Sequence, residues 1–280
     1  MTLVARFTNG QSSSWGLVYD GEIYPVGDKA TMFDALGDET LLADLEAFRE
    51  SPRDLDSIRL LAPILDPPQF LGVGLNYRDH VAESGTVIPT EPVTFGFLRN
   101  SIIGDGETIL IPPFTDQVDW EAELGVVIGK GGRDISESEA LDHVAGYTIV
   151  NDVSARDIQM SEGQWGRSKS FDTFKPMGPW ITTKDELGDA GGLGVSLWVN
   201  DDLKQASNTS ELIFSVPRLV SLLSRCTTLY PGAVIATGTP HGVGFSRTPP
   251  EFLRDGDVVT IEIEGIGRLA NPVKPASGSS

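Results

Sequence analysis

The sequence is poor in cysteine, histidine and positive charge, and each shortage excludes a class of function. Among 280 residues there are one Cys and three His, and 21 Lys and Arg stand against 40 Asp and Glu, a net charge of -19. The lone Cys226 cannot form an internal disulfide. An acidic chain repels nucleic acid and anionic membranes, so we expect neither as a partner. The start, MTLVARFTNG, lacks the pattern of a signal peptide, so we expect a cytoplasmic location.

Long apolar runs are also missing. No segment approaches the ~20 apolar residues that a membrane-spanning helix needs. Hydrophobic residues nevertheless make up 40% of the chain, enough to bury a sizeable core. The 31 Gly and 18 Pro favour short strands joined by tight turns over a helical bundle. The composition therefore predicts a strand-rich α+β fold.

The start of the chain predicts a small unit of its own. Two dipeptides typical of hairpin turns, Asn9-Gly10 and Asp20-Gly21, separate short apolar runs. Asp38 is a plausible N-cap for an amphipathic helix whose apolar face is Leu41, Leu42, Leu45 and Phe48. The stiff stretch Asp66-Pro67-Pro68 then predicts a domain boundary. We expect a small N-terminal α/β domain over residues 1–67, the main body over 68–275 and a tail over 276–280.

Three acidic residues precede an apolar run in the middle of the chain. Asp119, Glu121 and Glu123 are spaced two apart, so a strand would place their carboxylates on one face. Carboxylates this close repel one another unless a cation lies over them. Asp152, after the apolar run 147–150, offers a further carboxylate. Oxygen ligands without clustered His or Cys favour Mg2+ or Mn2+ over zinc. The alternative is an ordinary strand with one face in water.

Two further patterns have both a functional and a plain interpretation. His80 and Glu83 would meet on one helical turn, where the carboxylate orients the imidazole as a general base. The alternative is a solvated helix face with an incidental pair. The glycine-rich turn over residues 238–244 follows a predicted strand and can bring backbone amides close to an anion, or it can be a simple tight turn. Its His241 has no obvious partner in the sequence.

Five motifs occur in an order that resembles the fumarylacetoacetate hydrolase family, in its branch of acylpyruvate hydrolases and 2-hydroxyhepta-2,4-diene-1,7-dioate isomerases. They are GLNYRDHVAE, DWEAELGVVIG, GYTIVNDVSARDIQ, SKSFDTFKPMGPW and TGTPHGVG, within residues 70–273. The resemblance implies a mixed β-roll core and a homodimer. It also implies a site for Mg2+ or Mn2+ formed by Glu121, Glu123 and Asp152, with Asp119 outside the ligand set.

The same resemblance implies roles for other residues. His80 and Glu83 match a water-activating dyad on a lid segment, and Lys169 matches a catalytic lysine. The positions expected to contact substrate are Tyr77, Arg156, Gln159 and Thr239. Phe97 stands where family members often carry Lys, so we expect a more apolar pocket there.

The implied activity is hydrolysis of a carbon–carbon bond in a 2,4-dioxo acid such as an acylpyruvate or fumarylpyruvate. The substrate partner is thus a small keto acid. A decarboxylase or a keto–enol tautomerase acting on oxaloacetate-like acids remains an alternative, because it would use the same residues. A third alternative is a catalytically silent protein in which the metal only braces the fold.

Overall fold

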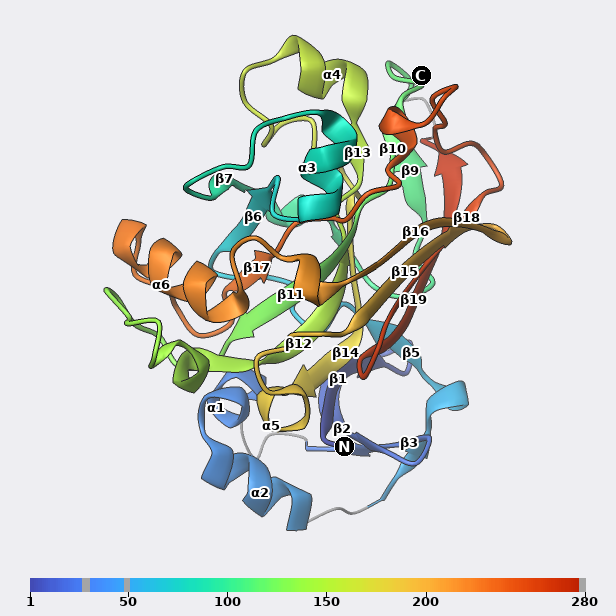
Figure 1. Ribbon diagram of the computed structural model, residues 1–280. Helices are drawn as coiled ribbons and strands as arrows, with labels where there is room; N and C mark the ends of the chain where they lie inside the picture. The colour runs from blue at the N-terminus through green and yellow to red at the C-terminus, as the bar shows by residue number, and fades with distance from the viewer. Residues whose placement is uncertain (27–30, 48–50, 277–280) are drawn as a thin grey trace.

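The computed structural model in Figure 1 describes residues 1–26, 31–47 and 51–276. Strands dominate it, in sheets that mix parallel and antiparallel pairs, as the composition and the resemblance predicted. Within the described residues, no helix is both long enough and apolar enough to cross a bilayer.

The largest sheet has 12 strands in the part of the chain that the structure describes. Its path runs through β4 (Arg53–Asp54), β3 (Glu22–Pro25), β2 (Ser13–Tyr19), β1 (Leu3–Thr8), β14 (Lys175–Thr183), β12 (Val144–Asn151), β11 (Ala122–Ile128), β17 (Val234–Ala236), β6 (Phe70–Gly74) and β7 (Val93–Gly96). Two short strands join from the side: β5 (Arg59–Leu61) pairs with β1, and β8 (Ile102–Ile103) pairs with β14.

A second sheet and a short strand pair complete the β-structure. The five-stranded sheet has the order β16 (Asp202–Asn208), β15 (Gly194–Val199), β18 (Val258–Ile263), β19 (Gly267–Pro275) and β9 (Ile109–Ile111). The pair consists of β10 (Val118–Asp119) and β13 (Ser154–Ala155). Alternate side chains of β15, such as Val195, Leu197 and Val199, are buried in the core shared with β11 and β12.

Helices cover the ends and one side of the sheets. They are α1 (Met32–Gly37), α2 (Glu39–Ala47), α3 (Arg78–Ser84), α4 (Arg156–Ser161), α5 (Lys184–Leu187) and α6 (Val216–Cys226). Asp38 accepts hydrogen bonds from the amides of Thr40 and Leu41, which confirms it as the cap of α2. Phe48, expected on that helix, lies outside the described residues. Figure 1 shows α3 and α4 at one end of the molecule and α1 and α2 at the other.

The N-terminal hairpins form as the turn dipeptides predicted, but they join the main sheet. β1 pairs with β2 on one edge and with β14 on the other, where Leu3 lies opposite Thr182. The large sheet is thus continuous across residue 67, and the division into two domains there stays a prediction.

The sheet order brings distant segments to one edge. β12 and β17 flank β11 and run antiparallel to it, so the start of β11 lies beside the ends of both neighbours. β6 runs parallel to β17, and the chain leaves it toward α3 at the same edge. Residues just outside these strand ends therefore meet, although they lie as far apart in sequence as Asn76 and Thr237, which share a 2.7 Å hydrogen bond.

Candidate metal centre

Three carboxylates converge where β11 begins and β12 ends. Ligand oxygens of Glu121, Glu123 and Asp152 lie within 4.8 Å of one another, and all three residues are buried. The backbone explains the convergence, because the amide of Asp152 donates to the carbonyl of Glu121 at 2.9 Å. The structure thus brings together the three residues that the family resemblance selected.

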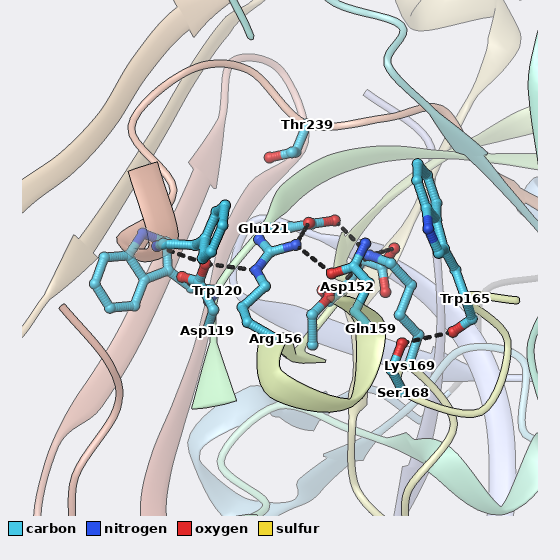
Figure 2. Close-up of polar contacts among 12 residues, drawn as sticks. Asp119, Trp120, Glu121, Asp152, Arg156, Gln159, Trp165, Ser168, Lys169 and Thr239 are labelled. Carbon is cyan, nitrogen blue, oxygen red and sulfur yellow. Dashed lines mark hydrogen bonds and ion pairs between the residues drawn. The ribbon is translucent and has the colours of Figure 1, made fainter. Parts of the chain in front are cut away.

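Asp119 is buried too but lies outside this group. Its carboxylate accepts from the amides of Gly244 at 2.7 Å and Phe245 at 2.9 Å. Arg156 joins it to the triad: Nε lies 2.7 Å from Asp119 Oδ2, and Nη1 lies 2.7 Å from Glu121 Oε1 (Figure 2). Asp119 therefore orients the arginine that contacts the triad.

Two buried lysines face Asp152. Lys169 Nζ lies 2.8 Å from Glu121 Oε2, from Asp152 Oδ2 and from Ser154 Oγ. Lys175 Nζ lies 2.8 Å from Asp152 Oδ1 and donates to the carbonyls of Val153 and Phe174. Sequence reasoning missed Lys175. The signal that was available is a lysine at the start of an otherwise apolar strand, β14.

The charges leave one carboxylate without a cationic partner. Burial opposes ionisation of Glu121, but Lys169 and Arg156 outweigh it and lower its pKa to about 2. Burial, Asp152 and Glu121 together raise the pKa of Glu123 well above its usual value. In the described residues no ion pair reaches Glu123, whose Oε2 accepts only the amide of Gly238. A cation at the triad would stabilise its ionised form.

Unsatisfied polar atoms indicate the same place. Asp152 Oδ1, Arg156 Nη2 and the Tyr77 hydroxyl are buried and have no hydrogen-bond partner among the described residues. Lys175 is close to Asp152 Oδ1, but the contact lacks hydrogen-bond geometry. Since buried polar atoms are nearly always satisfied, these residues fit a bound group, and their oxygen ligands suit a hard divalent ion. Glu121, Glu123 and Asp152 would hold it.

The predicted dyad lies on α3 beside this centre. His80 Nδ1 is 3.3 Å from Glu83 Oε2, with both side chains largely buried. Glu83 Oε1 accepts the amide of Gly242 at 3.0 Å. Burial opposes ionisation of Glu83, but the hydrogen bonds from His80 and Gly242 outweigh it and lower its pKa. Glu83 is therefore held as a carboxylate that can orient the imidazole.

The glycine-rich turn after β17 contacts anions, as one interpretation of the sequence expected, but they are the protein's own. Besides Glu83 and Asp119, the turn binds Asp79, which lies 3.0 Å from His241 Nδ1. His241, which had no obvious partner in the sequence, has one in the structure, and that partner is 162 positions away in the chain.

A cavity of about 300 Å3 opens over these groups. The predicted site residues that line it are His80, Glu121, Glu123, Arg156, Gln159, Lys169 and Thr239. Glu83 and Asp152 are not among the lining residues, and neither is Tyr77, which is fully buried. Phe97 does not line the cavity itself. Its ring packs at 5.3 Å against Phe95, which does, and Lys175 Nζ lies 4.6 Å from the ring centre. The expectation of a more apolar pocket at this position stays a prediction.

Comparisons with known proteins show which family the chain is similar to. The family model described as fumarylacetoacetate (FAA) hydrolase C-terminal matches residues 69–274. The chain is 48% identical over 219 residues to a mitochondrial oxaloacetate tautomerase of Xenopus laevis, covering 78% of this chain and 69% of the relative.

Solved structures resemble it over nearly its full length. A 2-hydroxyhepta-2,4-diene-1,7-dioate isomerase of Mycobacterium marinum has a TM-score of 0.83 and 34% identity, covering 99% of this chain and 100% of that one. A maleylpyruvate hydrolase of Sphingobium sp. SYK-6, solved with manganese(II) and pyruvate, has a TM-score of 0.83 and 30% identity with the same coverage.

Proposed function

Because the chain belongs to the fumarylacetoacetate hydrolase family, we propose that it is a Mg2+- or Mn2+-dependent enzyme that hydrolyses a carbon–carbon bond in a 2,4-dioxo acid of the acylpyruvate type. The observation that carries this proposal is that His80, Lys169 and two members of the acidic triad line a single cavity. Glu83 pairs with His80, and Asp152 completes the triad. A bound divalent ion would polarise the carboxylate and 2-oxo oxygens of the substrate and stabilise negative charge there.

The chain's own residues supply the rest of the chemistry. His80, oriented by Glu83, takes a proton from water, and the oxygen of that water adds to the distal carbonyl carbon. The bond between that carbon and the neighbouring methylene carbon breaks, which releases a carboxylic acid and the enolate of pyruvate. A proton then returns to the methylene carbon. Lys169 lies close enough to the triad to stabilise the enolate, and removing such a fixed charge commonly costs ~3 kcal/mol, or about 100-fold in rate.

A second candidate is keto–enol tautomerisation of oxaloacetate. It is favoured by the tautomerase named among the relatives at 48% identity. His80 would then move a proton between carbon and oxygen of the same substrate, and no water would be consumed. Decarboxylation of an oxaloacetate-like acid is a third outcome of the same residues, because it too develops an enolate.

Product analysis separates these reactions. Metal-stripped protein is assayed with and without Mg2+ or Mn2+ on acylpyruvates, fumarylpyruvate and oxaloacetate, with products resolved by mass. The hydrolase predicts metal-dependent release of pyruvate and a second acid, lost in His80→Ala. Oxaloacetate turnover with unchanged mass supports the tautomerase, and release of carbon dioxide supports the decarboxylase. No turnover with any acid contradicts all three and favours the silent protein.

We also propose that the enzyme is a homodimer, the assembly that the family resemblance implies. Light scattering of the purified protein should then give twice the chain mass of 30.1 kDa. A particle of the chain mass would contradict this proposal and leave the proposed chemistry unaffected.

A further inference from the structure

Beyond the charged groups, much of the cavity wall is apolar, and the polar uncharged lining residues are Ser84, Thr86, Gln159, Thr239 and Ser246. The apolar members come from β6, from β7, from the loop after α4 and from the turn after β17: Val73, Leu75, Phe95, Trp165, Val243 and Phe245. Figure 2 shows Trp165 at the end of the row of polar side chains, next to Lys169. We call this set the apolar wall. The apolar wall extends beyond the space that a metal-chelating head group needs. It can therefore contact the part of the substrate that does not bind the metal.

The apolar wall is built into the fold. A Cβ at Gly74 would lie 2.3 Å from the Trp165 ring, and one at Gly72 would lie 2.5 Å from the Phe95 ring. Glycine at both positions of β6 therefore makes room for the two aromatic side chains. The Phe95 and Trp165 rings meet edge to face at 5.5 Å, and Phe95 in turn packs at 5.3 Å against buried Phe97. This packing holds the wall in place.

The cavity offers no free cation for a second anionic group. Of the described lining residues, only His80, Arg156 and Lys169 can carry positive charge. Lys169 is held by Glu121 and Asp152, and Arg156 is held by Asp119 and Glu121, with only Nη2 unpaired. One spare donor beside the triad suits one substrate carboxylate.

Most backbone amides of the turn after β17 are already paired with the protein's own carboxylates. Gly238 donates to Glu123, Gly242 donates to Glu83, and Gly244 and Phe245 donate to Asp119. The described contacts leave only neutral groups on this side, such as the Thr239 hydroxyl. A charged tail placed against the apolar wall would lose its hydration without a compensating partner.

We propose, on the basis of the proposed function, that the apolar wall binds an uncharged apolar tail. The preferred substrates are then 2,4-dioxo acids that carry a single carboxylate and a branched alkyl or phenyl acyl group. A cavity of about 300 Å3 accommodates such a tail. The net charge of -19 acts in the same direction, because it disfavours the approach of dianions more than that of monoanions.

Binding, measured apart from turnover, tests this proposal. His80→Asn protein loaded with Mn2+ is titrated by calorimetry with oxalate, acetylpyruvate, benzoylpyruvate and succinylpyruvate. Oxalate has no tail and reports on the metal centre alone; failure of oxalate to bind in a metal-dependent way overturns the proposed function. With oxalate binding intact, we expect benzoylpyruvate to bind at least about 10-fold more tightly than succinylpyruvate. Equal affinities, or tighter binding of succinylpyruvate, overturn the tail assignment alone.

Variants of the apolar wall provide a second test, in which the protein is changed instead of the ligand. In the same His80→Asn background, Trp165→Ala should weaken benzoylpyruvate about 10-fold and leave oxalate unchanged. Tyr230→Ala, an exposed aromatic outside the cavity, is the matched control and should change neither. Met160 lines the rim and is 68% exposed, so Met160→Arg can add a distal cation without disturbing the core. It should strengthen succinylpyruvate binding relative to Met160→Leu. An unchanged ratio of the two tails in both Trp165→Ala and Met160→Arg overturns the proposal.

Discussion

Single residues decide the charge balance of this site. Four buried carboxylates, Asp119, Glu121, Glu123 and Asp152, face three buried cations, Arg156, Lys169 and Lys175. The group is therefore one negative charge in excess when all are ionised. A divalent ion reverses that sign and leaves one positive charge, which a substrate carboxylate neutralises. Lys175, absent from the expectations based on sequence, is part of this balance.

Replacing Lys175 by Met should destabilise the metal-free protein more than the metal-loaded one. Lys175 and Lys169 both contact Asp152, so the variant leaves this buried carboxylate with one cation instead of two. The loss should be a fraction of the about 3–5 kcal/mol that a fully unpaired buried charge costs. A bound divalent ion would replace part of the lost positive charge. Urea unfolding with chelator and with saturating Mn2+ measures both losses. Lys274→Met, at an exposed lysine, is the control. Equal losses under the two conditions would mean that Lys175 acts independently of the metal.

Among the elements, α3 is the one whose position the chemistry depends on. This short helix carries His80 and Glu83, and contacts from distant segments hold it. Asp79 contacts His241 and the Ser207 hydroxyl, and Arg78 donates to the carbonyl of Leu212 at 2.9 Å. Burial opposes ionisation of Asp79, but the hydrogen bonds from Ser207 and His241 outweigh it and lower its pKa. The ionised carboxylate of Asp79 therefore holds α3 against Ser207 and His241.

Replacing His241 by Ala should loosen α3. A hydrogen bond to a charged group contributes about 1.5–3 kcal/mol, so kcat/KM should fall roughly 10-fold or more, and hydrogen exchange of the amides in residues 78–84 should accelerate. His143→Ala is the control, since that histidine bonds only the carbonyl of Lys130 among the described residues. Unchanged exchange in His241→Ala would show that the contact does not hold the helix.

The same contacts predict how α3 responds to acid. The lowered pKa values of Asp79 and Glu83 mean that the folded state favours their ionised forms. Their stabilisation is therefore fully present above the ordinary carboxyl pKa and is lost as the pH falls through the lowered values. Exchange of residues 78–84, followed from neutral pH downward and corrected for its intrinsic pH dependence, should accelerate only at that acidic end. Loss of protection near neutral pH would contradict this assignment.

Features formed by residues close together in the sequence were predicted, whereas contacts between residues far apart in the sequence were missed. The triad was foreseen because Glu121 and Glu123 are two positions apart and Asp152 follows the next apolar run. The motif pattern then selected these three over Asp119. The hairpins and the cap of α2 were foreseen because they are local. His241 and Lys175 were missed because their partners, Asp79 and Asp152, become neighbours only when strands from separate parts of the chain align. The contact between Phe97 and Lys175 was missed for the same reason, because it too joins distant parts of the chain.

At the scale of the whole molecule, the site connects strands that lie far apart in the sequence. Glu121 directly precedes β11, Glu123 is the second residue of that strand, and Asp152 follows β12. A metal ion at the triad would therefore link strand ends that only folding brings together. The unfolded chain has no such cluster and binds the ion poorly. Metal binding should consequently stabilise the entire fold rather than one loop.

Removing the metal should therefore lower the melting temperature, and Glu123 should control the effect. An ion at 100 times its dissociation constant stabilises by about 2.7 kcal/mol, which corresponds to roughly 5–10 °C for a chain of this size. Glu123→Gln should abolish the shift seen by scanning fluorimetry between chelator and Mn2+, whereas Glu137→Gln, at an exposed acid, should keep it.

A second comparison uses the metal-free forms of wild type and Glu123→Gln. Because the pKa of Glu123 is raised in the fold, the folded state retains a proton that the unfolded chain has lost, and stability falls as the pH rises from the ordinary carboxyl range toward the raised value. Glutamine imitates the protonated acid and escapes this penalty. Stripped Glu123→Gln should accordingly melt above stripped wild type at neutral pH, and the gap should close as the pH is lowered. A variant that melts lower at every pH would show that Glu123 braces the fold without the ion, which would remove the electrostatic argument for a cation at this site.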